Sequence, residues 1–513
     1  MNIGIDLGTT NTLVAFVDEF GNVKKLDFSN GKSDNRCLLP SCIAYDGEKD
    51  AILVGQAALD FVQNNPIGAR RFIRDSKYSM GDDGKVWNIG RRSFDAEGVA
   101  VEILKEVMRE LKSRFPEEKE FTAFVTVPAR FETQEPRLAT KSALKKAGFL
   151  PANENNTLTD EPIAAAIAYS KELQDAANVL VVDFGGGTFD LSLLKSSMVG
   201  QAVSAERLEP IAWGGDKQLG GNNVDKVLFE IIADKVYADT GLDIRIDLSN
   251  SQALMKCRPE VLSAALTVRN YVQSSDGIKS KLFSRRNPEE TVYISELFDD
   301  YTLKMTISAE LYRQKMQPLA DKMRKSIDDM YNSFSVSPEK TDKVLVVGGM
   351  AHELCLIDML TEIFGAETLV IPDDSLYLVA RGAAICNSRF KVHVDNKAYS
   401  SIAVVVAAPD GRSRTLDVIV SEGMTISDDF SVCRKYMPNA DNAKYLQLSF
   451  IEYKGKFDSS KSNAFYEVEL ELNRPMKRNK QIITINYVFN EDKLFIINAQ
   501  QIDGTVTQFS VRL

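Results

Sequence analysis

A glycine triplet flanked by two acids carries the strongest chemical signal in this chain. The segment reads VVDFGGGTFDLSLL over 181–194, with Asp183 before the glycines and Asp190 after them. Backbone N–H groups of glycine-rich turns can form a nest for an anion, and the missing side chains let phosphate oxygens approach. Carboxylates at this position would repel phosphate directly. They fit a hydrated Mg²⁺ lying between, because Mg²⁺ keeps waters and binds one or two carboxylates plus phosphate oxygens.

The N-terminus follows the same plan as this segment. Residues 2–17, NIGIDLGTTNTLVAFV, and residues 179–194 each contain a β-branched strand, an aspartate, a turn of small residues and a second strand. Both patterns predict β-hairpins with tips too rich in glycine to serve packing. A single hairpin could equally be a tight turn with solvated acids. The matched pair favours a duplicated α/β core with both tips facing one cleft.

Helix and strand patterns alternate around the two hairpins as far as about residue 390. Apolar residues recur at helical spacing in some segments, and short β-branched runs mark others. The expected elements are helices at 98–114, 135–147 and 161–173, strands at 121–129 and 343–350, and a strand pair at 291–307. This alternation is typical of an α/β architecture.

The pattern changes from about residue 395 onward. Runs such as TLDVIVSE, YLQLSFIEY and QIITINYVF are short β segments separated by turn residues. About 120 residues of this kind predict an independent antiparallel β-sandwich. The expected domains are 1–390, a linker over 391–400, and 401–513.

Composition limits the classes of protein that remain. The net charge is −10 with both signs mixed along the chain, which argues against nucleic acid and anionic membrane as partners. There is no apolar run long enough for a membrane span, and the N-terminus is a poor signal peptide, so a cytoplasmic protein is expected. Six cysteines lack a CxxC pair, and only two histidines occur. The chemistry is therefore expected to use carboxylates, glycines and hydroxyls.

Several motifs together resemble one known family. In order along the chain they are IGIDLGTTNT, TVPARF with RLATKSA, DEPIAAAIAY, VVDFGGGTFD, LGGNNVD, VLVVGGM and VARGAA. This order and spacing resemble the heat-shock 70-kDa (DnaK-like) chaperones. The resemblance implies an actin-like, ribonuclease-H-like duplicated ATPase domain of two lobes, followed by a peptide-binding β-sandwich. The chain stops where the family's helical lid should begin, so a divergent member without that lid is expected.

The resemblance also implies which residues bind ATP or ADP with Mg²⁺, with K⁺ as an optional second ion. Asp6 and Asp183 would hold the metal through water, Asp190 would lie close to the attacking water, and Glu161 would sense the metal–phosphate cluster. Thr188 would belong to the second phosphate loop and count among the catalytic residues. The switch toward the second domain would be Pro128 and Arg137. The remaining nucleotide contacts would be Gly8, Thr9, Thr10, Asn11, Gly185, Gly186, Gly187, Gly220, Gly221, Asp276, Lys279, Gly348 and Gly349.

Three departures from the family pattern stand out. The lysine expected near the γ-phosphate falls on Arg70 in GARRFIR, and arginine is bulkier and forked where lysine is a compact point charge. Arg70 could still clamp the phosphate as an arginine finger, but slow turnover is expected. Met350 and His352 replace a small polar residue and an arginine in the adenine loop. The linker KVHVDNK lacks the family's apolar character.

Three functions follow as hypotheses. The first is an ATP-driven chaperone that binds unfolded or extended peptides, works in protein folding and the stress response, and uses a J-domain co-chaperone and a nucleotide-exchange factor. The second is a nucleotide-switched scaffold or regulator with little ATPase activity, which Arg70 and the linker favour. The third is a small-molecule kinase of the actin-like superfamily, since a fold alone does not determine function.

Overall fold

The computed structural model describes most of the chain. The residues outside the description are 30–35, 66–70, 83, 129–133, 152–156, 171, 174–175, 198–206, 247–256, 274–277, 284–288, 299–300, 388–395, 399, 408–413, 427–429, 454, 456, 458–463, 490–493 and 511–513. Arg70, Asp276 and most of the expected linker therefore lie outside the described residues.

The first lobe is built on a mixed sheet that starts with the N-terminal hairpin. Its strand order is β11-β10-β1-β2-β3, with β12 beside β10 and β4 beside β2. β1 pairs antiparallel with β2 and parallel with β10, so the predicted hairpin is present. The strands are β1 (Asn2–Leu7), β2 (Asn11–Val17), β3 (Val23–Lys25), β4 (Leu39–Pro40), β10 (Thr122–Val127), β11 (Leu150–Pro151) and β12 (Leu158–Asp160).

The second lobe repeats this plan with a sheet of order β15-β14-β13-β18-β19. β13 pairs antiparallel with β14 and parallel with β18, as β1 does with its two partners. The register of the hairpin sets Asp183 opposite Asp190. The strands are β13 (Asn178–Phe184), β14 (Phe189–Ser197), β15 (Arg207–Asp216), β18 (Lys343–Val347) and β19 (Leu369–Val370).

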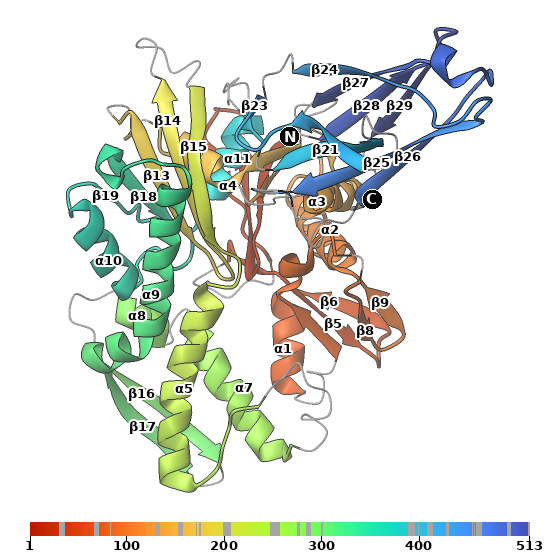
Figure 1. Ribbon diagram of the computed structural model, residues 1–513. Helices are drawn as coiled ribbons and strands as arrows, with labels where there is room; N and C mark the ends of the chain where they lie inside the picture. The colour runs from red at the N-terminus through yellow and green to blue at the C-terminus, as the bar shows by residue number, and fades with distance from the viewer. Residues whose placement is uncertain are drawn as a thin grey trace.

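Helices cover both faces of each sheet (Figure 1). α2 (Ala96–Arg114) and α3 (Gln134–Lys146) bury one face of the first sheet, and α11 (Leu378–Asn387) packs on the other. α4 (Glu161–Ala168) contacts α11 and the second sheet, so this helix pair forms the layer between the two sheets. Gly4 and Gly382 allow this packing, because a Cβ at either position would overlap the backbone of the facing element.

The outer face of the second sheet carries α9 (Ala309–Ser333) and α10 (Leu354–Phe364). Each lobe also extends away from its sheet. In the first lobe these elements are β5 (Cys42–Asp46), β6 (Ala51–Val54), α1 (Gln56–Asn64), β7 (Phe72–Arg74), the 3₁₀ turn η2 (Ser76–Ser79), β8 (Trp87–Ile89) and β9 (Arg92–Phe94). In the second lobe they are α5 (Gly221–Thr240), α7 (Pro259–Gln273), α8 (Ile278–Phe283), β16 (Glu289–Phe298) and β17 (Tyr301–Ser308), followed by the turn η3 (Pro338–Lys340).

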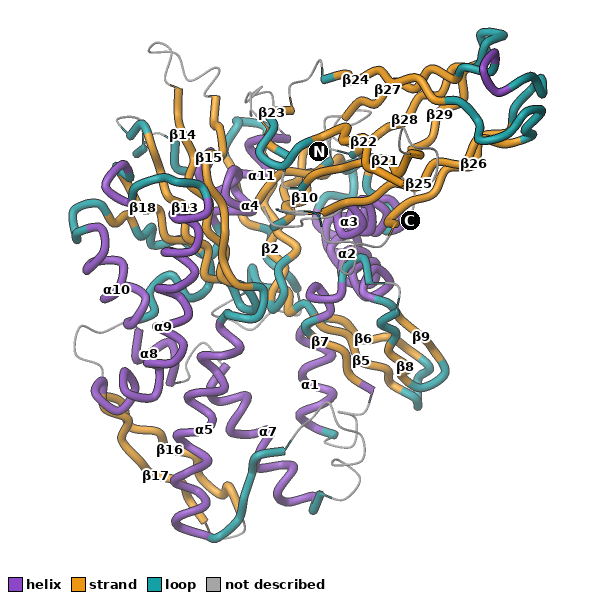
Figure 2. The backbone as a smooth tube through the Cα atoms, viewed as in Figure 1, coloured by secondary structure: helices purple, strands orange, loops and turns teal. Residues whose placement is uncertain are grey.

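The C-terminal part contains two four-stranded sheets, of order β22-β21-β25-β26 and β24-β27-β28-β29 (Figure 2). Alternate residues of both sheets, such as Phe450, Ile485 and Phe495, are fully buried in one shared core. The strands are β20 (Asn396–Lys397), β21 (Ser401–Ala407), β22 (Arg414–Val420), β23 (Thr425–Ile426), β24 (Ser431–Tyr436), β25 (Tyr445–Tyr453), β26 (Ala464–Glu471), β27 (Ile483–Phe489), β28 (Phe495–Gln500) and β29 (Val506–Ser510), with the turn η4 (Arg478–Lys480) before β27.

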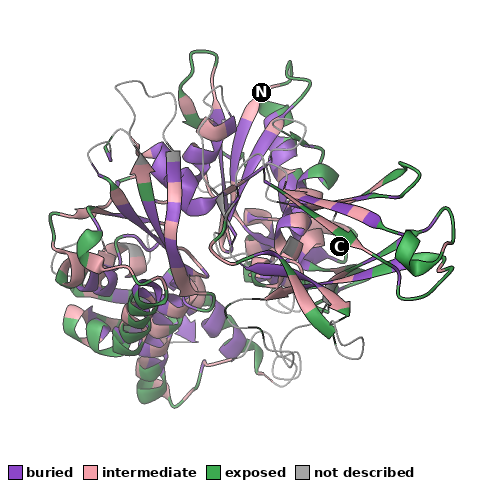
Figure 3. Ribbon diagram, turned by 45° about the horizontal axis from the view of Figure 1, so that its top comes forward, coloured by how far each residue is buried: buried purple, intermediate pink, exposed green. Residues whose placement is uncertain are grey.

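This β-sandwich lies against the first lobe (Figures 1 and 3). Leu138 of α3 packs on the sandwich core, so a helix of the α/β part completes the hydrophobic surface of the β part. The small β20–β23 pair lies near β15 of the second lobe. Among the described helices, none is both long enough and apolar enough to cross a membrane.

Candidate functional site

A cavity of about 190 Å³ lies where the tips of the two hairpins meet. Both hairpins contribute to its wall, which confirms that the two tips face one cleft. The side chains and glycines that line it are Asp6, Gly8, Thr9, Thr10, Asn11, Leu13, Lys77, Glu161, Asp183, Gly185, Gly186, Thr188, Gly221, Asn222, Asp225, Lys279, Gly348, Gly349, Met350, Leu376 and Val379.

The glycine triplet allows the two hairpins to touch. A Cβ at Gly186 would overlap the side chain of Thr10, and a Cβ at Gly187 would lie 2.7 Å from Thr9 Cγ2. Any other residue would therefore push the hairpins apart. The hydroxyl of Thr10 is buried and has no hydrogen-bond partner among the described residues, so it can donate to a ligand in the cavity.

Four buried carboxylates and one lysine gather beside this contact. Asp6, Asp183 and Asp190 come from the hairpins and Glu161 from the first residue of α4, and all but Asp6 are nine-tenths or more buried. Burial raises the pKa of Asp6, raises that of Glu161 to about 7, and, together with the charge of Glu161, raises that of Asp183 well above its usual value. Such a surplus of acids is unfavourable unless a cation offsets it.

Lys77 supplies one positive charge to this acid cluster. Its Nζ lies 2.7 Å from Glu161 Oε1, and only 12% of the side chain is exposed. Burial lowers the pKa of Lys77, but the charges of Glu161 and Asp6 more than compensate, so the pKa is raised overall. The ammonium is therefore charged at neutral pH, surrounded by carboxylates.

The prediction that Arg70 takes the place of the lysine near the γ-phosphate falls on a residue outside the described ones. Within the described residues, Lys77 reaches the cluster from η2, which follows β7 after Asp75. The sequence signal for Lys77 is weak, because DSKYS has the composition of a surface turn. Only the distance to Glu161, which is 84 residues further along the chain, reveals its place.

A buried ion pair links the start of α4 to α3. Arg137 Nη1 donates to Asp160 Oδ1 at 2.9 Å, and both side chains are almost fully buried. Asp160 ends β12 and directly precedes Glu161, so the partner of Arg137 is the chain neighbour of a residue of the acid cluster. Pro128, the other predicted switch residue, is buried just after β10.

The other end of the cavity belongs to the second lobe. Lys279 Nζ lies 2.7 Å from Asp225 Oδ1, and Gly221, Gly348 and Gly349 line the wall beside them. Gly348 has φ of 90°, and a Cβ there would lie 2.5 Å from Asp183 Oδ1, so both its backbone conformation and its surroundings require glycine. Asp225 was missed in the sequence, where it appears as an ordinary acid at the start of a helix.

Comparison with known proteins agrees with this geometry. Residues 2–405 match the family described as Hsp70 protein.

The chain belongs to the Hsp70 family.

Among similar Hsp70 proteins are those named chaperone protein DnaK from Thermotoga neapolitana and Thermotoga maritima, each 30% identical over 386 residues. The chaperone protein DnaK of Thermosipho melanesiensis is 28% identical over the same length. These alignments cover 75% of this chain and 58% of each relative. Membership of the Hsp70 family implies an actin-like ATPase part and a β-sandwich, and the mixed α/β sheets and the two β sheets described above agree with that division.

Most of the residues predicted from the Hsp70 resemblance meet at the cavity. Gly187, Asp190 and Gly220 adjoin it without lining it: Gly187 accepts a hydrogen bond from Tyr78, and Gly220 packs against Gly187. Of the two departures in the adenine loop, Met350 lines the cavity, whereas His352 is exposed and does not. Asp276 and Arg70 lie outside the described residues.

In this Hsp70 chain, the residues that line the cavity fit a ligand made of phosphate and a hydrated Mg²⁺. Within the described part of the chain, no three His, Cys, Asp or Glu side chains are close enough to coordinate a metal together. A hydrated Mg²⁺ needs fewer protein ligands, because water and phosphate oxygens fill most of its octahedral shell. The surplus of buried carboxylates and the unpartnered Thr10 hydroxyl are the observations that fit such a ligand.

Proposed function

We propose that this chain is an ATP-dependent molecular chaperone whose actin-like part binds and hydrolyses Mg-ATP between the two hairpins. The observation that carries the proposal is the cluster of buried acids and Lys77 beside two interlocked glycine-rich tips. A nest of backbone N–H groups there suits phosphate, and the acids suit a hydrated cation.

Each group in the cluster has a role in this proposal. Gly8 to Asn11 and Gly185 to Thr188 hold the phosphates through N–H groups and hydroxyls. Asp6 and Asp183 would hold a hydrated Mg²⁺ through its waters, and Asp190 and Thr188 would orient the attacking water. When bound, Mg²⁺ would neutralise charge on the phosphates.

Lys77, rather than Arg70, is proposed as the cation near the terminal phosphate. A compact ammonium among carboxylates can turn toward a phosphate oxygen as charge develops there. The slow turnover predicted from Arg70 is not part of this proposal, because Lys77 already supplies a lysine beside the acids. The nucleoside would lie between Gly221, Lys279 and Gly349.

The link from this site to the β-sandwich is proposed to run through α3. Glu161 contacts Lys77, the neighbouring Asp160 is paired with Arg137, and Leu138 packs on the sandwich core. A shift of Glu161 on hydrolysis could thus reach the sandwich through a short, buried chain of contacts. Such coupling requires two arrangements of these contacts with different affinity for nucleotide.

The β-sandwich is proposed to bind extended polypeptide at the end that carries β24–β25 and β26–β27 loops. Met437, Tyr445 and Ile482 expose apolar side chains at this end of the sheets. An extended peptide could form main-chain hydrogen bonds there and place one apolar side chain against them. A J-domain co-chaperone and a nucleotide-exchange factor complete the proposal, as the resemblance implied.

ATP turnover with and without an unfolded polypeptide tests this function. We expect slow basal hydrolysis that requires Mg²⁺ and rises when a reduced, unfolded client is added. Tight ATP binding without turnover would instead support the nucleotide-switched regulator. Turnover that responds only to a sugar or polyol would support the kinase hypothesis and contradict the chaperone proposal.

A further inference from the structure

Residues 74–78 of the first lobe lie beside the acid cluster and contact the second lobe. This segment consists of the last residue of β7, Asp75 and the start of η2, and it carries Lys77. We call it the bridging segment. It contacts the second lobe on both sides of the lysine.

The contact after the lysine is made by Tyr78. Its hydroxyl donates a hydrogen bond of 2.5 Å to the carbonyl oxygen of Gly187, at the tip of the second hairpin. Gly187 has no side chain, and a Cβ there would collide with the Tyr78 hydroxyl, so glycine is required for this contact. The tyrosine ring itself remains 44% exposed, so its hydroxyl rather than its burial ties it to the second lobe.

The contacts before the lysine are made by Arg74 and Asp75. Asp75 Oδ2 pairs with Arg74 Nε at 3.0 Å, and Asp75 Oδ1 accepts from Asn222 Nδ2 at 3.0 Å. Arg74 also donates to Asn222 Oδ1 at 3.5 Å and to Gln273 Oε1 at 3.4 Å. Asn222 and Gln273 belong to α5 and α7 of the second lobe.

The first lobe holds the bridging segment at its start, where Arg74 pairs with Cys42 of β5, and at the buried Ser76. Asp75 adopts the left-handed conformation, with φ of 56°, which is uncommon for a residue other than glycine and needs support from its surroundings. η2 spans only four residues, and 3₁₀ turns of that length are weak. The side chain of Lys77 also has four rotatable carbons and loses much rotamer freedom when it is held.

We propose that Tyr78, with the Arg74–Asp75–Asn222 contacts, positions Lys77 in the acid cluster only while the two lobes are closed. These are positioning residues, because they act through Lys77 and do not themselves touch the phosphates. Opening of the cleft would break the contacts to the second lobe on both sides of the lysine and withdraw the lysine, so hydrolysis would depend on closure. This inference rests on the proposed ATPase function.

The test uses the full chain with Tyr78→Phe and, as a matched control, Tyr237→Phe. Tyr237 is an exposed tyrosine on α5 that makes no described side-chain contact with the cleft. Single-turnover hydrolysis of radiolabelled ATP and ATP affinity are measured for each. In parallel, labelling of Lys77 by an amine-reactive ester is followed by peptide mass spectrometry without nucleotide.

The loss of one hydrogen bond predicts about a threefold to tenfold slower hydrolysis in Tyr78→Phe. Its ATP affinity should change less than its rate, and Lys77 should be labelled several-fold faster, since the ammonium leaves its buried pair more often. Asn222→Ala should shift both quantities in the same direction, and Tyr237→Phe neither.

Unchanged hydrolysis and unchanged labelling in Tyr78→Phe would overturn the inference while leaving the ATPase proposal intact. Slower hydrolysis with unchanged labelling would also overturn it, because Tyr78 would then act other than through Lys77. If the unmodified chain does not hydrolyse ATP, the proposed function fails; the coupling of closure to hydrolysis then fails with it, even where labelling shows that Tyr78 holds Lys77.

Discussion

At the scale of single residues, the main feature of the site is its excess of negative charge. Asp6, Glu161, Asp183 and Asp190 are brought into one cluster with Lys77. Carboxylates without water favour their protonated forms, and each one raises the pKa of its neighbours. A ligand that brings a cation removes this penalty, so the cluster favours binding of such a ligand.

Lys77→Met should abolish most hydrolysis and leave ATP binding nearly intact. Removing one group aimed at developing charge typically lowers the rate about 100-fold or more. Rapid-quench measurement with radiolabelled ATP gives the rate, and equilibrium titration gives the affinity. Arg70→Met is the matched comparison, and a larger loss there than in Lys77→Met would return the role to Arg70.

Glu161 should make the stability of the metal-free chain depend on pH. Its pKa is about 7 in the folded chain against an ordinary value of 4.5. Because the folded value is the higher one, this contribution is fully present below pH 4.5 and is lost as pH rises through about 7. A shift of this size corresponds to on the order of 3 kcal/mol.

Thermal unfolding in EDTA over this pH range checks that expectation. The melting temperature should fall as pH rises, and Glu161→Gln should flatten the fall, because an amide does not titrate. Glu19→Gln, at an exposed turn, should retain the slope of the unmodified chain. Equal slopes for Glu161→Gln and the unmodified chain would show that Glu161 is not the titrating group.

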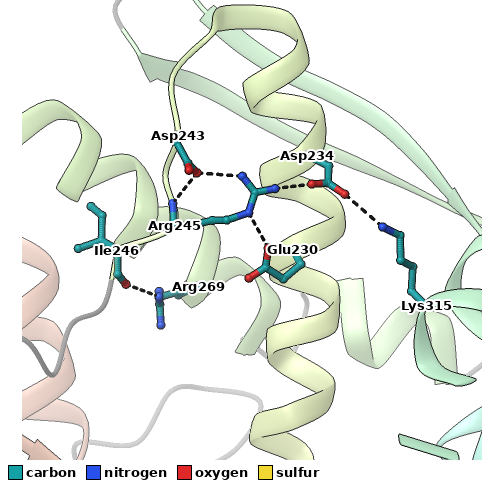
Figure 4. A network of polar contacts seen from close by, with 7 residues as sticks. All are labelled: Glu230, Asp234, Asp243, Arg245, Ile246, Arg269 and Lys315. Atoms are coloured by element: carbon teal, nitrogen blue, oxygen red, sulfur yellow. Dashed lines mark hydrogen bonds and ion pairs between the residues drawn. The ribbon is translucent and has the colours of Figure 1, made fainter. Parts of the chain in front are cut away.

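At the scale of elements, ion pairs secure the segment that leaves α5. Arg245 contacts Glu230 at 2.6 Å, Asp243 at 2.9 Å and also Asp234, which Lys315 of α9 contacts at 3.2 Å (Figure 4). Figure 4 also shows Arg269 of α7, which donates to the carbonyl of Ile246 at 2.8 Å. The short segment 243–246 is thereby tied to α5 and α7, and Lys315 links α9 to the same side of α5.

Arg245→Gln should loosen this segment without unfolding the lobe. Arg245 is partly exposed, so its pairs are screened by solvent and together contribute about 1 kcal/mol. We expect faster amide exchange over 242–246, with unchanged exchange in the buried strand β13. Lys235→Gln, which removes one exposed pair within α5, provides the control. Protection over 242–246 equal to that of the unmodified chain would mean that packing alone holds the segment.

At the scale of the whole molecule, the sandwich and the α/β part share a hydrophobic contact. Leu138 packs on the sandwich core from the helix that also carries Arg137. One turn of α3 thus faces the interior of the α/β part with Arg137 and the sandwich with Leu138. This places the interface between the two parts within a few residues of the acid cluster.

Leu138→Ser should separate the sandwich from the first lobe and leave basal hydrolysis unchanged. Burying a hydroxyl in place of an apolar side chain costs about 1–3 kcal/mol at this contact. Small-angle X-ray scattering should report a larger radius of gyration, and stimulation of ATP turnover by unfolded polypeptide should fall. Leu150→Ser, at an exposed position of the same lobe, is the control. An unchanged radius with full stimulation would contradict a role for Leu138 in the interface.

The sequence predicts the hairpins, their shared cleft and most of the residues that line it. These features are local: a strand, an aspartate and a glycine turn lie within ten residues of each other, and β-branching and glycine mark them. The same patterns separate the α/β part from the β-rich part. The sequence did not point to Lys77, because a lysine in a short polar turn has no periodicity to distinguish it.

The amino-acid sequence by itself determined the duplicated hairpins, their acids and the Hsp70 resemblance, because each of these depends on residue types within a short segment of the chain. Only the tertiary structure decided which cation meets those acids, that Asp225 pairs with Lys279, and that Tyr78 reaches Gly187. These contacts join segments dozens to more than a hundred residues apart. Their geometry depends on how the two lobes pack against each other. Local sequence propensities do not specify contacts between residues so far apart in the chain.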